Sequence, residues 1–170
     1  MTVAEEVAAY LGEHCPHVFA IIGAGNMALL DAIARLGKTE VVYQHHEQAC
    51  VMSAAAYYRV CGRVSVALVT TGAGSSNALT GVLSAFMDSI PVVVVAGNEA
   101  SSRPHIGRAR GVQGYDSVAV AEHMTKWAGR FYSPNVVGYH LFRAFEDATE
   151  GRPGPTWLEI PMDIQALEAA

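Results

Sequence analysis

The chain has 170 residues, 51% of them hydrophobic, and 11 Lys and Arg against 16 Asp and Glu give a net charge of -5. This predicts a single globular domain over residues 1–170 and argues against a nucleic-acid partner, because no basic tract is present to hold a phosphate backbone. The first twenty residues lack the features of a signal peptide, and Asp88 and Pro91 interrupt the most hydrophobic segment, so we expect a cytoplasmic protein without a membrane span.

Near the N-terminus, Thr2 and Glu5 are spaced as a helix capping box and precede apolar residues at helical spacing. We therefore predict a first helix that begins near Val3.

Short apolar runs then alternate with helical patterns along the chain. Strands are predicted at 17–22, 40–44, 64–69, 91–97 and 155–160. Helices are predicted at 26–37, 47–60, 78–87 and about 137–148. This alternation is typical of an α/β protein with a doubly wound, mainly parallel sheet of about six strands, covered by helices on both faces.

A long polar segment, residues 98–117, interrupts this alternation and contains three arginines and one histidine: Arg103, His105, Arg108 and Arg110. Loops of this length in compact domains are usually functional or disordered.

The three cysteines are odd in number and form no C-x-x-C pair. This usage suits a reducing compartment. We expect Cys15, Cys50 and Cys61 to be buried structural thiols.

Ligands of open parallel sheets bind beyond the carboxyl ends of the strands, where residues 23–26, 44–48 and 70–77 are predicted to meet. One interpretation is a dinucleotide site, because Gly23, Gly25 and Ala28 fit the G-x-G-x-x-[GA] pattern, although the second strand lacks the acidic residue that binds ribose. The glycines of 70–77 could bind an anion at a helix start or simply permit tight packing.

Other chemistries find less support in the sequence. The histidine pair at 45 and 46 has no second ligand cluster at suitable spacing, so we expect no metal bound by this chain. No G-x-S-x-G elbow marks a hydrolase serine.

Taken together, several motifs resemble the pyrimidine-binding domain of thiamine diphosphate enzymes, and among them the acetolactate synthase large subunit. The resemblance rests on "VFAIIGAG", "HHEQACVMSAAAYYRVCGR", "VTTGAGSSNALTGVLSAFMDSIPVVVVAG", "VQGYDSVAVAEHMTKWA" and "GRPGPTWLEIPMDIQ". It covers nearly the whole chain. The family departs from this sequence at Ile22, Ala73 and Val112, which leaves the choice of substrate open.

The resemblance assigns roles to particular residues. Glu47 would hydrogen-bond N1' of the cofactor's aminopyrimidine and favour its imino tautomer, and Gln113 would reach toward the reacting carbon. The remaining cofactor contacts would come from the three loops: Gly23 and Ala24 at the pyrimidine edge, and Thr71, Gly72 and Asn77 as the neighbouring wall. Alternatively, Glu47 is a solvated glutamate that caps its helix, and Gln113 is a solvated loop amide.

The resemblance also implies a partner. In the family, magnesium and the diphosphate are bound by another domain with a Gly-Asp-Gly motif, and a flavin by a middle domain. We therefore expect a separate diphosphate-binding subunit, a probable heterotetramer and no FAD. The expected reaction is decarboxylation of pyruvate or a related 2-oxo acid, with possible carboligation. A non-catalytic regulatory or partner-binding module is the alternative.

Overall fold

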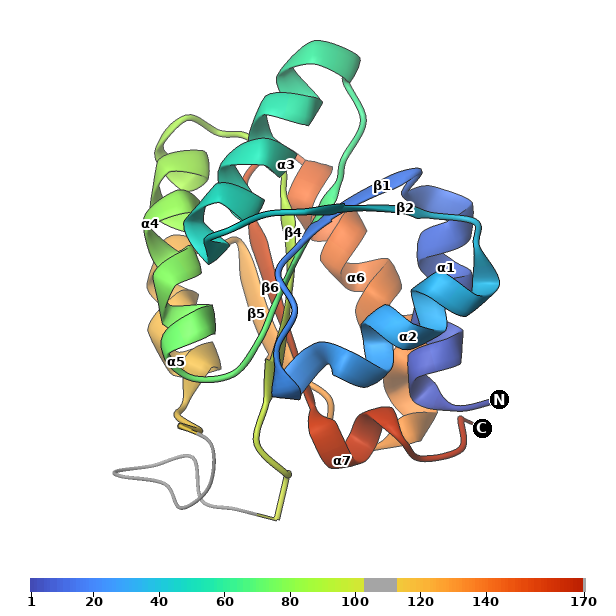
Figure 1. The fold of residues 1–170 in the computed structure, drawn as a ribbon. Coiled ribbons are helices and arrows are strands. Elements are labelled where there is room, and N and C mark those ends of the chain that lie inside the picture. Colours follow the sequence, from blue (N-terminus) through green and yellow to red (C-terminus); the bar gives the residue numbers. More distant parts are fainter. Residues whose placement is uncertain (103–112, 170) are drawn as a thin grey trace.

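A computed structural model describes residues 1–102 and 113–169 of the chain. The strands are β1 (His17–Ala20), β2 (Glu40–Tyr43), β3 (Val66–Val69), β4 (Val93–Asn98), β5 (Trp127–Arg130) and β6 (Thr156–Pro161). They form one parallel sheet in the order β2-β1-β3-β4-β6-β5 (Figure 1). The predicted doubly wound α/β fold is confirmed.

Helices connect the strands. They are α1 (Val3–His14), α2 (Met27–Leu36), α3 (Glu47–Cys61), α4 (Ala73–Met87), α5 (Ser117–Ala121), α6 (Val137–Thr149) and α7 (Met162–Gln165). Short 3-10 turns occupy Ala24–Asn26, Glu122–Met124 and Pro134–Val136. Within the described ranges, no helix is both long and apolar enough to cross a membrane.

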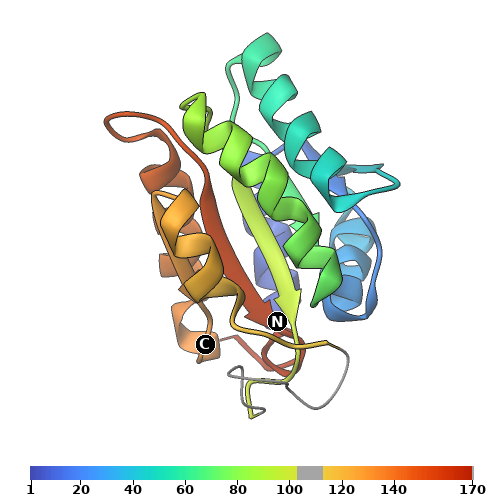
Figure 2. The same cartoon turned by 90° about the vertical axis from the view of Figure 1, so that its left-hand side faces the viewer.

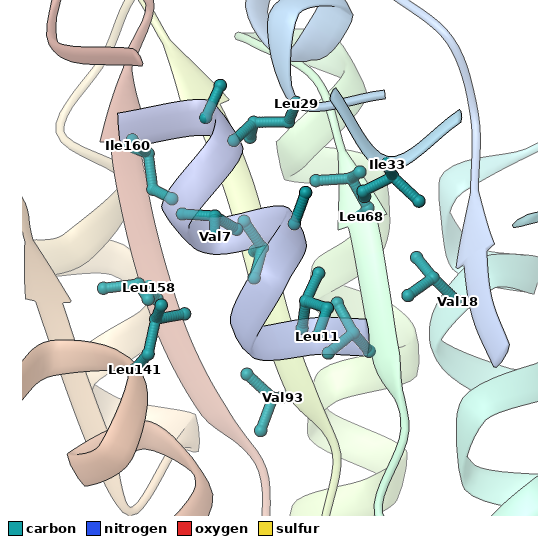
Figure 3. Close-up of a cluster of buried hydrophobic side chains, with 14 of the residues drawn as sticks. Val7, Leu11, Val18, Leu29, Ile33, Leu68, Val93, Leu141, Leu158 and Ile160 are labelled. Carbon is teal, nitrogen blue, oxygen red and sulfur yellow. The ribbon is translucent and has the colours of Figure 1, made fainter. Parts of the chain in front are cut away.

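Two apolar clusters hold the helices on the sheet. Helices α1, α2 and α6 cover one face, and α3, α4 and α5 cover the other, where Figure 2 shows them in front of the strands. In the first cluster, Val7 and Leu11 of α1 lie among Leu68 of β3 and Leu158 and Ile160 of β6 (Figure 3). Each fully buried side chain of this size contributes roughly 1.5–3 kcal/mol.

The predicted start of the first helix is confirmed. The backbone N–H of Glu5 donates to Thr2 Oγ1 at 3.2 Å, and the backbone N–H of Thr2 donates to Glu5 Oε2 at 2.8 Å. This reciprocal pair is a capping box.

Some sequence predictions need correction. The strand predicted at 17–22 ends at Ala20, and Ile22 beyond it is 63% exposed. Strand β5 was not among the predicted runs because "WAGR" has alanine and glycine where β-branched residues usually mark a strand. Cys61 is exposed rather than buried, because it is the last residue of α3, on the surface.

A buried ionic network joins β5 to β6 and to the segment that precedes α5. The Glu159 carboxylate has no exposed surface and accepts hydrogen bonds from Arg130 and from the Ser117 hydroxyl. The Trp157 indole N–H donates to the same hydroxyl at 3.1 Å, and Arg130 Nη2 donates to Asp116 Oδ1 at 2.9 Å. Burial lowers the pKa of Arg130, but Glu159 and Asp116 raise it by more, so Arg130 stays charged.

The ring of His140 on α6 makes the stability of the fold dependent on pH. It is stacked on Phe131 at 5.2 Å, and its Nδ1 is buried without a hydrogen-bond partner in the part of the chain that the structure describes. Burial, and then the charge of Arg143, lower the pKa of His140 below its ordinary value.

We expect the free energy of unfolding to decrease as the pH falls below about 6.5. His140 then binds a proton in the unfolded chain but stays neutral in the folded chain, where its pKa is lower. Urea denaturation between pH 5 and 7 measures this slope. His140→Phe keeps an aromatic ring and should flatten the slope. If wild type and His140→Phe show the same slope, the pH dependence of stability comes from other groups.

Candidate active site at the carboxyl ends of the strands

The three segments predicted to form the site are neighbours in the structure. Strand β1 lies between β2 and β3, so the loop after β1 is adjacent to the start of α3 on one side and of α4 on the other. The chain leaves β1 toward β2 and returns to β3 on the opposite side. This is the switch point at which parallel sheets form ligand crevices.

Glu47 is the first residue of α3 and is only 8% exposed. The helix is capped by another side chain, since His46 Nδ1 accepts a hydrogen bond from the backbone N–H of Gln48 at 3.2 Å. Glu47 is therefore neither solvated nor needed as the cap, which contradicts the alternative of a solvated glutamate that caps its helix.

The two oxygens of the Glu47 carboxylate have different surroundings. Asn77 Nδ2 on α4 donates to Oε2 at 3.1 Å. The other oxygen faces Gly74, where a Cβ would lie 3.0 Å from Oε1. The protein thus fixes one oxygen by a hydrogen bond and packs a residue without a side chain closely against the other.

The segment 70–77, predicted as a loop, is largely helical. Helix α4 begins at Ala73, so Asn77 lies in its second turn. Gly72 turns the chain sharply with φ 58° and ψ -123°, a conformation that residues with a Cβ rarely adopt. Glycine and serine are poor helix formers, and packing of α4 on the sheet overrides this local preference.

Thr70 connects the loop after β1 to α4, a role the sequence did not reveal. The backbone N–H of Gly25 donates to Thr70 Oγ1 at 3.0 Å. A Cβ on Gly23 would lie 2.4 Å from Oγ1, and a Cβ on Gly74 would lie 2.5 Å from Cγ2. Two glycines of the loop after β1 and Gly74 of α4 therefore converge on one threonine, and these glycines were its only signal in the sequence.

The amides of the first glycine loop are engaged within the protein. Gly23 N–H donates to Asn26 Oδ1 at 3.0 Å, in addition to the Gly25 bond to Thr70, and Gln165 Nε2 donates to the Gly25 carbonyl at 2.7 Å. A dinucleotide cradle presents such N–H groups to the pyrophosphate. The dinucleotide interpretation of this loop is therefore wrong.

Gln113 joins the site from the far end of the long polar segment. A Cβ on Gly72 would lie 2.4 Å from the Cβ of Gln113, and the backbone N–H of Ala73 donates to Gln113 Oε1 at 3.4 Å. Gln113 has a φ of 63°, in the left-handed region. The first amide of α4 is thus bonded to this side chain rather than to an anion. Four side chains of the long segment and one family departure lie outside the described residues: Arg103, His105, Arg108, Arg110 and Val112.

Two further predicted site residues, Thr71 and Ala24, lie at the loop after β1. Thr71 is buried, and a Cβ on Gly25 would meet its Cγ2 at 2.4 Å. Ala24 is exposed and lines a hollow of about 620 Å³ between α2 and α7, together with residues that include Met27 and Met162. The structure therefore places Thr71 against the loop after β1, and the cofactor roles of Thr71 and Ala24 both stay predictions.

The cysteine beside the carboxylate is not a nucleophile. Burial, and then the charge of Glu47, raise the pKa of Cys50 to about 12, so it stays a thiol. Its Sγ donates to the His46 carbonyl at 3.7 Å. In residues 1–102 and 113–169, no group of three His, Cys, Asp or Glu side chains could hold a metal ion.

Substituting Gly72 tests the contact between the α4 turn and Gln113. We expect Gly72→Ala to lower the free energy of unfolding by about 3 kcal/mol, through backbone strain and overlap with Gln113. Gly37→Ala is the matched control, because Gly37 also has a positive φ but nothing within 4 Å of its Cβ position. It should cost about 1–2 kcal/mol. Equal losses in urea denaturation would show that Gln113 moves aside freely.

Comparison with known proteins finds a protein family that the sequence matches. Residues 1–121 match the family described as "Thiamine pyrophosphate enzyme, N-terminal TPP binding domain". The chain is 36% identical over 148 residues to the acetolactate synthase large subunit of Buchnera aphidicola subsp. Schizaphis graminum, which covers 87% of this chain and 25% of the relative. It is 37% identical over 147 residues to the isozyme 3 large subunit of Escherichia coli, which covers 86% and 25%. The mitochondrial acetolactate synthase of Schizosaccharomyces pombe is 36% identical over 156 residues, 92% of this chain and 23% of the relative. The chain thus spans about a quarter of the length of these curated relatives.

Proposed function

The chain belongs to the thiamine pyrophosphate enzyme family, as a form of its N-terminal TPP binding domain, and we propose that it holds the aminopyrimidine of thiamine diphosphate in an acetolactate synthase-like decarboxylase or carboligase. The observation that supports this best is the Glu47 carboxylate, nearly buried, fixed at Oε2 by Asn77 and flanked at Oε1 by Gly74.

The residues present fit an aminopyrimidine. A ring nitrogen needs one hydrogen-bonding carboxylate oxygen, and we assign this role to Oε1 of Glu47, since Asn77 donates to Oε2. Gly23 and Gly72 pack so closely against Thr70 and Gln113 that a Cβ would overlap these residues, so both glycines fix the turns that border the site.

Thiamine diphosphate, when bound, supplies the carbon nucleophile that takes up a 2-oxo acid and permits loss of carbon dioxide. Glu47 holds and exchanges a proton at Oε1, and Asn77 keeps the carboxylate oriented for that exchange. Gln113 orients the substrate through its amide nitrogen, because its Oε1 accepts from Ala73. Pyruvate or a related 2-oxo acid is the proposed donor, and transfer to an acceptor is the possible second step.

The diphosphate and its magnesium are proposed to lie on a separate subunit, with the active site between the two chains and two copies of each. This proposal follows the resemblance, in which another domain with a Gly-Asp-Gly motif binds the diphosphate and magnesium. The exposed side chains of Ile22 and Tyr43, at the carboxyl ends of β1 and β2, offer apolar area next to the site for such a partner.

The experiment is to co-express the chain with a candidate diphosphate-binding subunit and to follow pyruvate-dependent release of carbon dioxide with thiamine diphosphate and magnesium, without added flavin. Release by the complex, and by neither subunit alone, supports the proposal. A stable complex that binds the cofactor but turns over neither pyruvate nor other 2-oxo acids would favour the non-catalytic module instead.

A further inference from the structure

Two hydroxyl groups connect the Gln113 segment to the start of α4. Ser75 Oγ lies 3.1 Å from the Gly72 carbonyl oxygen and 3.1 Å from the Tyr115 hydroxyl. Serine has one hydroxyl hydrogen and a carbonyl only accepts, so when Ser75 donates to Gly72 the bond between the hydroxyls is donated by Tyr115. Burial is the main cause that raises the pKa of Tyr115, which keeps this donor protonated.

The chain at Tyr115 and at the residue that follows it is also fixed. Asn98 Nδ2, at the end of β4, donates to the Tyr115 carbonyl at 2.8 Å. The next residue, Asp116, is bound by Arg130 at 2.9 Å, and Arg130 is in turn bound to fully buried Glu159. The segment is therefore anchored to β4, β5 and α4 within three residues of Gln113.

Gln113 itself has weaker attachments. Its side chain is exposed, its oxygen accepts a long hydrogen bond of 3.4 Å from the backbone N–H of Ala73, and its backbone is left-handed. A residue of this kind keeps one orientation only when its surroundings impose it. Gly72 lies directly against Gln113, and Tyr115, two residues along the chain, is bound to Ser75 of α4.

We propose that Tyr115 and Ser75 are positioning residues that hold Gln113 over the Gly72 turn. This inference rests on the proposed function, and it assigns to a tyrosine and a serine that were not among the predicted site residues the task of aligning the Gln113 amide with the substrate. Neither residue touches the substrate. Their effect on turnover passes through Gln113.

The kinetic test is a double-mutant cycle in the assembled complex. We expect Tyr115→Phe to lower kcat about tenfold with little change in KM, because misplacement of an orienting group slows the reaction more than it weakens binding. Ser75→Ala should match it. In a Gln113→Ala background, Tyr115→Phe should have no further effect. Tyr139→Phe is the control, since Tyr139 is exposed on α6, on the other face of the sheet.

If the Gln113→Ala and Tyr115→Phe effects on kcat multiply in the double variant, the two residues act independently and the proposal is overturned. An unchanged kcat in Tyr115→Phe would also overturn it. Amide hydrogen exchange on the purified chain separates this inference from the proposed function. Residues 113–121 and 70–77 should exchange faster in Tyr115→Phe and Ser75→Ala than in wild type or Tyr139→Phe. Unchanged exchange refutes the positioning role, whereas faster exchange in a chain that never turns over a 2-oxo acid would leave the positioning intact and refute the proposed function.

Discussion

Glu47→Gln is expected to lower turnover of the assembled complex by about 10²–10⁴-fold, the range that a positioned acid-base group contributes. Glutamine has the size of glutamate and keeps an oxygen that can accept from Asn77, so the fold and the helix start should be preserved. What it loses is the ability to hold and release a proton at Oε1. The measurement is the rate of pyruvate-dependent carbon dioxide release at saturating cofactor.

Glu13→Gln is the matched control, because it removes one carboxylate from an exposed position on α1 without touching the site. Its rate should equal that of wild type. If Glu47→Gln instead retained its rate within a factor of about three while the complex still bound cofactor, the proton transfer would fall outside the range of a positioned acid-base group and Glu47 would only be structural.

The sequence predicted the fold well where pattern and packing agree. Val66–Val69 and Val93–Asn98 are buried along their whole length, so their apolar runs identify them as central strands. β5 escaped prediction because it lies at the edge of the sheet, where "WAGR" needs no continuous apolar run. Its register is instead fixed by pairing with β6 and by the buried bond between Arg130 and Glu159, two long-range interactions.

The site was predictable in its residue types but not in its contacts. Glu47 and the glycines could be placed at the carboxyl ends of the strands from their spacing alone. The partner of each Glu47 carboxylate oxygen could not be predicted. Asn77 reaches Glu47 only because α4 begins at Ala73, and "AGSSN" has no helical signal of its own. Thr70, Ser75 and Tyr115 were missed for a related reason, since single hydroxyls leave no periodic pattern in a sequence.

Removing the buried charge of Glu159 should cause the largest loss of stability. Arg130 is 7% exposed at its side chain, and Glu159 is fully buried, so Glu159→Gln leaves a buried guanidinium with only partly exposed Asp116 as its counter-charge. Breaking a buried pair in this way costs about 3–5 kcal/mol, which corresponds to a decrease in Tm on the order of 10 °C for a chain of this size. Thermal and urea denaturation of the purified chain measure both quantities.

The exposed pair between Arg59 and Asp88 provides the comparison, with a distance of 2.6 Å and side chains that are 61% and 52% exposed. Asp88→Asn should cost less than about 1 kcal/mol, because water compensates both charges.

Replacing both buried partners with apolar residues, Arg130→Met with Glu159→Leu, should recover much of the stability lost in Glu159→Gln, since neither charge is then buried alone. That recovery need not extend to activity, because Arg130 also binds Asp116 and thereby anchors the segment that carries Gln113. A stable double variant with restored turnover would show that this anchor is dispensable, whereas a stable but slow one would tie the buried network to the site.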